Sequence, residues 1–89
     1  GLIELDHNLK NSIIKVKALE SLVESLKINV DQFEELYRLT SKSYSLGKST
    51  LFELLEVQDN LLDSKINLAS NKISLYELAE TFNWQSDNK

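Results

Sequence analysis

The feature of this 89-residue sequence that most limits its fold is the near absence of residues that end helices. The chain contains no Pro, and its only interior Gly is Gly47, close to the middle. Pro and Gly are the residues that most often interrupt helices and form turns. The sequence therefore predicts two long helices joined at one bend, and it excludes a fold of many short strands.

The first half of the chain carries one apolar heptad seam. Steps of three and four residues connect Leu2, Leu5, Leu9, Ser12, Val16, Leu19, Val23, Leu26, Val30, Phe33, Tyr37, Thr40, Tyr44 and Gly47, and most of these are apolar or aromatic. A 3.5-residue repeat of this length keeps one side of a helix against a partner helix. We therefore expect a first helix over about residues 2–46.

Signals for a turn and a new helix follow directly. Gly47 can adopt the left-handed conformation that ends helices, and Thr50 with Glu53 matches a capping box, with Ser49 as an alternative cap. We expect a turn at about 47–49, a second helix over about 50–82 and a tail at 83–89. The expected fold is all-α, an antiparallel coiled-coil helical hairpin formed by residues 1–89.

The second helix carries two apolar seams. One comprises Phe52, Leu55, Asp59, Leu62, Ile66, Ala69, Ile73 and Tyr76. The other comprises Leu54, Val57, Leu61, Ser64, Leu68, Asn71, Leu75, Leu78 and Phe82. At about 100° per residue, the two seams lie on nearly opposite sides of the helix. We expect such a helix to have a neighbour on each side.

The first helix repeats this feature weakly, through Ile14, Ala18, Ile28, Leu39 and Leu46. A row of helices packed on both flanks forms a sheet of helices, and closing that sheet produces a barrel. One hairpin cannot close it, so we expect a piece of an α-helical barrel that several copies or further hairpins complete. Association also fits a chain this small that has no Cys for disulfides.

The net charge of −4 argues against nucleic acid as a partner, because phosphate binding needs a basic surface. The acidic excess lies on the second helix, where one polar strip without a base comprises Glu53, Glu56, Asn60, Asp63, Asn67, Ser70, Ser74 and Glu77. Gln58, Lys65 and Lys72 lie on the opposite strip. The acidic strip either lines a passage, where it would attract cations, or is ordinary solvated surface.

Signals for metal, cofactor or membrane insertion are not found in the sequence. His7 has no second ligand at helical spacing, so we expect no metal site. The sequence has no Gly-rich phosphate loop and no nucleophile triad, and we expect no cofactor. Because no run of about 18 apolar residues is present, this segment is not expected to span a membrane.

The run from Tyr44 to Gln58, which reads YSLGKSTLFELLEVQ, resembles the second periplasmic hairpin of outer membrane factors of the TolC type. The strongest element is Tyr-x-x-Gly followed by the Leu-Leu-Glu-x-Gln spacing, and the similarity continues through Leu61, Leu62 and Leu68 to Tyr76. It covers roughly residues 30–82, whereas residues 2–29 match only as a heptad helix. The resemblance implies a homotrimer whose hairpins form a periplasmic tunnel leading to an outer-membrane β-barrel.

The same resemblance assigns roles at the bend. Glu53 and Glu56 occupy the positions of acids that line the tunnel entrance, where the family usually has Asp. Tyr44 matches a tyrosine that helps latch the entrance closed, although Ser49 stands near a position where a family member has Arg. The implied docking tip for a periplasmic adaptor protein, and through it an inner-membrane transporter, comprises Leu46, Gly47, Lys48, Ser49 and Thr50.

Three other interpretations compete with a channel segment in the periplasmic portion of an outer-membrane protein. Paired carboxylates serve glycosidases, but Glu53 and Glu56 on one exposed turn have no cleft between them, so we expect no enzyme. The hairpin of a periplasmic adaptor is a second possibility, although its Arg, Leu, Ser docking spacing is not found, since Lys42 follows Arg38 at the Leu position. A generic structural coiled coil would explain the heptads but not the two opposed seams or the tip motif.

Overall fold

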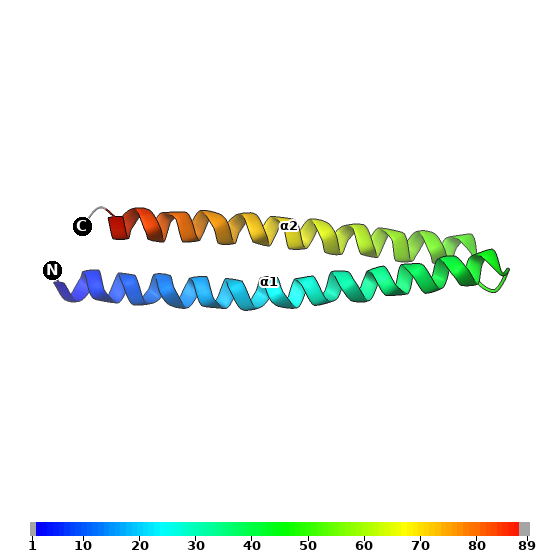
Figure 1. Ribbon diagram of the computed structural model, residues 1–89, viewed down its shortest axis with the longest axis horizontal. Coiled ribbons are helices and arrows are strands. Elements are labelled where there is room, and N and C mark those ends of the chain that lie inside the picture. Colours follow the sequence, from blue (N-terminus) through cyan, green and yellow to red (C-terminus); the bar gives the residue numbers. More distant parts are fainter. Residues whose placement is uncertain (1, 88–89) are drawn as a thin grey trace.

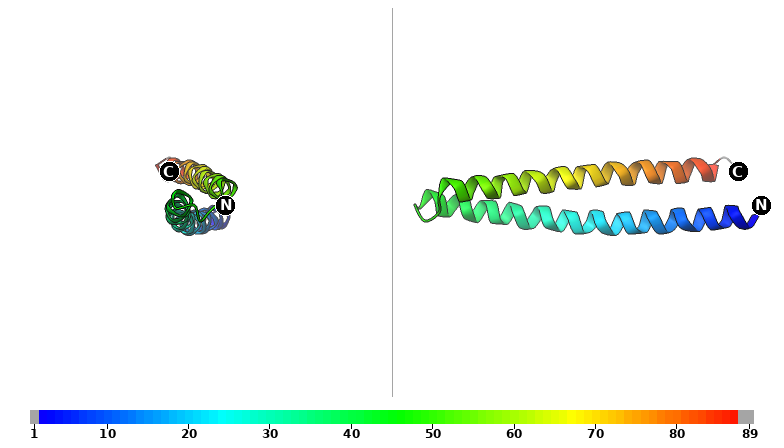
Figure 2. Two further views of the ribbon diagram at one scale, coloured as in Figure 1. Left: turned by 90° about the vertical axis from the view of Figure 1, so that its right-hand side faces the viewer. Right: turned by 180° about the vertical axis from the view of Figure 1, so that it is seen from behind.

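The chain folds as a hairpin of two long helices that lie side by side and run in opposite directions (Figure 1). This computed structural model describes residues 2–87 and the side chains of residues 9–81. Helix α1 spans Leu2–Ser45 and helix α2 spans Leu51–Asp87. The molecule measures 68 × 15 × 15 Å, and Figure 2 shows the two helices end on and from behind. The all-α helical hairpin expected from the sequence is confirmed.

The heptad seam of α1 is the side that packs on α2. Its central residues Val23, Leu26 and Val30 are buried and form the core of the hairpin. Toward either end, the seam is half-buried at Leu9, Ser12, Val16, Leu19, Phe33, Tyr37 and Thr40. Leu2 and Leu5 lie outside the described side chains. The seam is therefore continuous from residue 9 to residue 40, with its driest part near the middle of α1.

Hydrogen bonds at the bend end α1 as a Schellman motif. The Lys48 N–H donates to the carbonyl of Ser43 at 2.9 Å, and the Gly47 N–H donates to that of Tyr44, also at 2.9 Å. Gly47 has φ of 75°, in the left-handed region that side chains with a Cβ rarely adopt. The expectation that Gly47 ends the first helix is confirmed.

Thr50 begins α2 as its N-cap. Its Oγ1 accepts a hydrogen bond from the Glu53 N–H at 3.0 Å, which satisfies one of the backbone donors exposed at a helix start. Ser49, the alternative cap, instead donates its hydroxyl to Ser43 Oγ at 2.6 Å and joins the two sides of the bend. The connection between the helices spans residues 46–50.

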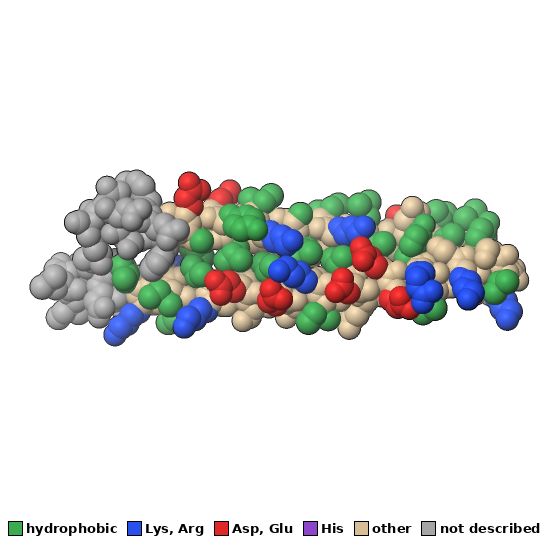
Figure 3. Space-filling model, viewed as in Figure 1, with side chains coloured by type: hydrophobic (Ala, Val, Ile, Leu, Met, Phe, Trp, Pro, Cys, Tyr) green, Lys and Arg blue, Asp and Glu red, His purple; other side chains and the backbone are tan. Residues whose placement is uncertain are grey.

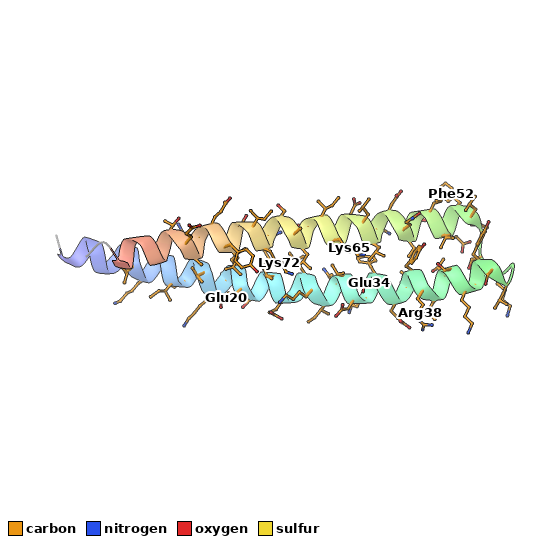
Figure 4. The ribbon with its side chains drawn as sticks, turned by 45° about the horizontal axis from the view of Figure 1, so that its top comes forward. Glu20, Glu34, Arg38, Phe52, Lys65 and Lys72 are labelled. Atoms are coloured by element: carbon orange, nitrogen blue, oxygen red, sulfur yellow. The ribbon has the colours of Figure 1, made fainter. Side chains whose placement is uncertain are left out.

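The two seams of α2 have different surroundings. The seam that runs from Leu54 to Leu78 is half-buried at every position, and it packs on α1. The other seam is exposed at every position from Phe52 to Tyr76, and in Figure 4 the labelled Phe52 points away from α1. Phe82 lies outside the described side chains. We call the exposed set Phe52, Leu55, Asp59, Leu62, Ile66, Ala69, Ile73 and Tyr76 the outer strip of α2.

The expected end of the second helix was wrong. We placed it near residue 82 with a tail at 83–89, but α2 continues to Asp87. Residues 83–87 are polar apart from Trp84. They include neither Pro nor Gly, so nothing in them removes a backbone hydrogen bond or favours a left-handed stop.

Candidate functional site

The end of the hairpin at residues 44–56 contains the side chains to which the resemblance assigned a role, from Tyr44 to Glu56. Among the expected docking residues, Leu46, Gly47, Lys48 and Thr50 are exposed, and Ser49 is half-buried through its bond to Ser43. The turn is held by backbone bonds at Gly47 and Lys48 rather than by burial. The tip therefore has a defined shape and leaves its side chains accessible.

The tip is more apolar than the sequence analysis recognised. Leu46 is 61% exposed, Leu51 is 52% exposed and Phe52 is 78% exposed. The sequence pattern assigns Phe52 to a seam of the second helix and gives Leu51 no role. The available signal was the presence of large apolar residues on both sides of a Gly turn, where solvated loops usually carry polar ones. Leu46, Leu51 and Phe52 together make an exposed apolar cap on the hairpin.

Glu53 and Glu56 lie on the first turns of α2 and are both exposed. They are three positions apart, so their carboxylates share one face of the helix. The positive end of the helix dipole favours an acid in the first turn of α2, which gives Glu53 an ordinary structural reason to be there. Tyr44, the expected latch, is exposed on the last turn of α1 at the same end of the molecule.

The acids at the tip continue as a polar strip along α2. All members of this strip are exposed, namely Glu53, Glu56, Asn60, Asp63, Asn67, Ser70, Ser74 and Glu77. Ser74 donates its hydroxyl to the carbonyl of Ser70 at 3.2 Å, and the Asn71 amide donates to the carbonyl of Asn67 at 2.8 Å. Such bonds along the helix satisfy side chains locally, and the strip remains free of bases.

The basic strip of α2 lies where α2 meets the acids of α1. Lys65 Nζ lies 3.6 Å from Glu34 Oε1 on the facing helix. Lys72 is half-buried in a shallow hollow that Glu20 and Glu24 also line. Figure 4 shows Lys65 beside Glu34 and Lys72 directed toward α1, and Figure 3 shows bases and acids intermixed along this side. An acid of α1 thus offsets the charge of Lys65, whereas the acidic strip of α2 contains no base.

A second ion pair lies on α1. Arg38 holds Glu35 with two hydrogen bonds, Nε to Oε2 at 3.0 Å and Nη2 to Oε1 at 2.6 Å. These bonds, together with the guanidinium charge of Arg38, lower the pKa of the Glu35 carboxyl. The same bonds and the carboxylate charge of Glu35 raise the pKa of Arg38. Both side chains are more than half exposed, so the ion pair adds little to stability.

The part of the chain that the structure describes contains neither a candidate metal site nor a helix that could span a membrane. Among the described residues, no group of three or more His, Cys, Asp and Glu side chains could hold a metal ion. His7 lies outside the described side chains. Over the same part of the chain, neither helix has a stretch apolar enough and long enough to cross a bilayer.

Comparisons with known proteins add no relative. No protein-family model matches the chain, and neither curated proteins nor solved structures contain a match to it.

Proposed function

We propose that this hairpin is a wall segment of a periplasmic tunnel in an outer-membrane efflux or secretion channel, with residues 44–56 at the tunnel entrance. The hairpin belongs to a homotrimer in the parent protein. Its tip docks a periplasmic adaptor protein, which couples the channel to an inner-membrane transporter. The segment works by assembly and ion attraction, without catalysis.

The observation that carries the proposal is the state of the two α2 seams. One seam packs on α1, and the opposite seam exposes Phe52, Leu55, Leu62, Ile66, Ile73 and Tyr76 to solvent. Exposed apolar surface of this length marks a contact with another molecule. A helix with a neighbour on each flank is the repeating unit that a wall of helices needs.

The acidic strip fits the inner surface of such a wall. It is exposed and lies between the two seams, and the Lys65–Glu34 pair lies on the other side of α2. In a trimer, Glu53 and Glu56 would contribute six carboxylates around one axis. Carboxylates in a narrow passage raise the local concentration of cations.

The tip suits docking because it is rigid and apolar at once. Its backbone is fixed by the bonds to Ser43 and Tyr44, while Leu46, Leu51 and Phe52 remain exposed. A preformed apolar surface binds with a smaller entropic cost than a flexible one. These residues add to the docking tip that the sequence resemblance implied.

Ion selectivity of the full-length trimer in a planar bilayer tests the proposal. Replacing Glu53→Gln together with Glu56→Gln is expected to reduce the preference for cations. Glu80→Gln serves as the control, because Glu80 is also exposed but lies off the acidic strip. If the double variant and the control have the same selectivity as the unmodified channel, Glu53 and Glu56 do not line the passage.

Adaptor crosslinking at residue 48 tests the docking assignment separately. Phe52→Ser removes the most exposed large side chain of the apolar cap, and Gly47 and Thr50 still set the turn. Crosslinking to the adaptor is expected to fall while the helix content stays unchanged. Normal crosslinking would contradict the docking assignment.

A further inference from the structure

The outer strip of α2 is a long apolar surface that the described part of the hairpin leaves uncovered. From Phe52 to Tyr76 it runs about 36 Å at 1.5 Å per residue. Phe52 and Tyr76 are 78% and 68% exposed, and the aliphatic members between them are about half exposed. Stable interfaces take roughly 600 Å² or more from each partner, and six large half-exposed side chains provide an area of that order.

Residue types along the outer strip are ordered symmetrically about Ser64. From either end inward, the order is aromatic, aliphatic, small or charged, and aliphatic. When two strips lie antiparallel, each residue of one copy faces the residue of the other copy that is equally far from position 64 on the opposite side. The facing pairs are Phe52–Tyr76, Leu55–Ile73, Asp59–Ala69 and Leu62–Ile66. The strip therefore complements a second copy of itself, with the one carboxylate opposite the smallest side chain.

We propose that the outer strip of α2 binds the outer strip of a second copy of this chain, in an antiparallel pair whose twofold axis crosses the interface at the level of residue 64 along α2. The two tips then point in opposite directions. The same patch serves both partners, as a twofold interface requires. On each flank of an antiparallel helix pair, a residue of one helix meets a residue at the same heptad position of the other helix.

A parallel pairing of the two strips fits less well. In register, it would place Asp59 of one copy against Asp59 of the other inside an apolar seam, where an unpaired carboxylate is costly to bury. The antiparallel pair places Ala69 there, which leaves room for the Asp59 side chain to reach water. The position of this carboxylate decides the direction of the pair.

The exposed face of α1 is also a poorer partner for the outer strip. Ile14, Ile28, Leu39 and Leu46 are exposed there, but polar residues alternate with them on the same face, namely Ser21, Ser25, Gln32, Glu35 and Lys42. A seam against α1 would bury several of these polar groups. The outer strip interrupts its apolar pattern only at Asp59.

Along the two flanks of the pair, charged residues mostly lie opposite uncharged ones. Lys72 meets Gln58, and Glu56 meets Ser70, when the strips are antiparallel. Lys65 meets its own copy near the axis, but Glu34 of the same chain lies 3.6 Å from its ammonium and offsets the charge. Asp63 also meets its own copy, and this contact is the one uncompensated repulsion of the interface.

The inference does not rest on the proposed channel function. In a tunnel with all tips at one end, a neighbouring helix would cover the outer strip, so the antiparallel pair is the form of the chain outside such an assembly. A strictly monomeric chain would overturn the pair and leave the channel proposal standing. Unchanged ion selectivity in the bilayer experiment would contradict the channel proposal and leave the antiparallel pair standing.

Sedimentation equilibrium of the full 89-residue chain, and of two variants in which Asp replaces Ile, tests whether the outer strip is the surface that associates. Ile66→Asp is expected to weaken association by at least about tenfold, because it buries an unpaired carboxylate at the seam. Ile28→Asp is the matched control, since Ile28 is 57% exposed and Ile66 is 58% exposed. Both variants should keep their helix content. A monomeric unmodified chain, or loss of association only in Ile28→Asp, overturns the proposal.

Single Cys variants test the direction of the pair, and the chain has no natural Cys to interfere. Asp63→Cys is expected to form a disulfide-linked dimer, because the two copies of residue 63 meet near the axis. Glu77→Cys is not expected to do so, since its two copies are about 39 Å apart along an antiparallel pair. A disulfide at residue 77, or none at residue 63, rules out the antiparallel arrangement.

Discussion

The backbone N–H of Lys48 donates a 2.9 Å hydrogen bond to the carbonyl oxygen of Ser43, five residues earlier in the chain. This bond folds the chain back over the last turn of α1 and requires the left-handed conformation of Gly47. A Cβ at position 47 would meet nothing within 4 Å. The preference for Gly is therefore a matter of backbone conformation and not of space.

Replacing Gly47 by Ala is expected to lower the free energy of unfolding by about 1–2 kcal/mol, the strain of a left-handed residue with a Cβ. Urea denaturation of the isolated chain measures this change. Gly47→Asn should cost less, because Asn tolerates the left-handed region. Equal losses for Ala and Asn would indicate that something other than backbone strain limits the turn.

Packing at the centre of α1 should dominate the stability of the hairpin. Leu26 is 7% exposed, whereas Leu22, one turn away, is 45% exposed. We expect Leu26→Ala to cost at least about 2 kcal/mol and Leu22→Ala to cost well under 1 kcal/mol. Denaturation midpoints of both variants provide the comparison. Similar losses at the two positions would contradict the assignment of the inner seam.

Much of this fold could be predicted from the sequence because its signals are local. Gly47 and Thr50 mark the bend through backbone conformation and capping, and both do so in the structure. The spacing of the apolar residues that flank Val23 and Leu26 marks the packed side of α1. Each of these signals depends on a residue and its near neighbours, so no knowledge of the rest of the molecule was needed.

Which of its two seams α2 packs against α1 could not be predicted in the same way. Its two seams are similarly apolar, so periodicity alone does not decide between Leu54 and Leu55. The short connection of residues 46–50 decides it, because it fixes which side of the first α2 turn meets α1. The 3.6 Å contact of Lys65 with Glu34 and the apolar cap at Phe52 follow from that facing.

Acidification should affect α1 through the Glu35 carboxyl. Its pKa is lowered by the hydrogen bonds and charge of Arg38, so the folded state favours its ionised form. The resulting stability is fully present above the unfolded pKa of about 4.3 and is lost as the pH falls through the lowered folded value. Comparing the thermal midpoints of the unmodified chain and Glu35→Gln at neutral and acidic pH tests this. The effect is expected to be small, and the difference between the two chains should shrink on acidification; a growing difference would contradict it.

The single carboxylate of the outer strip should limit how strongly the chain pairs with itself. In the antiparallel pair Asp59 lies opposite Ala69, and it must stay hydrated at the edge of an apolar seam. Asp59→Leu fills that layer and is expected to strengthen association by at least about tenfold in sedimentation equilibrium. Asp31→Leu makes the same substitution at an exposed position of α1 and should leave association near that of the unmodified chain. Equal strengthening by both variants would mean that added apolar surface, wherever it lies, drives the association.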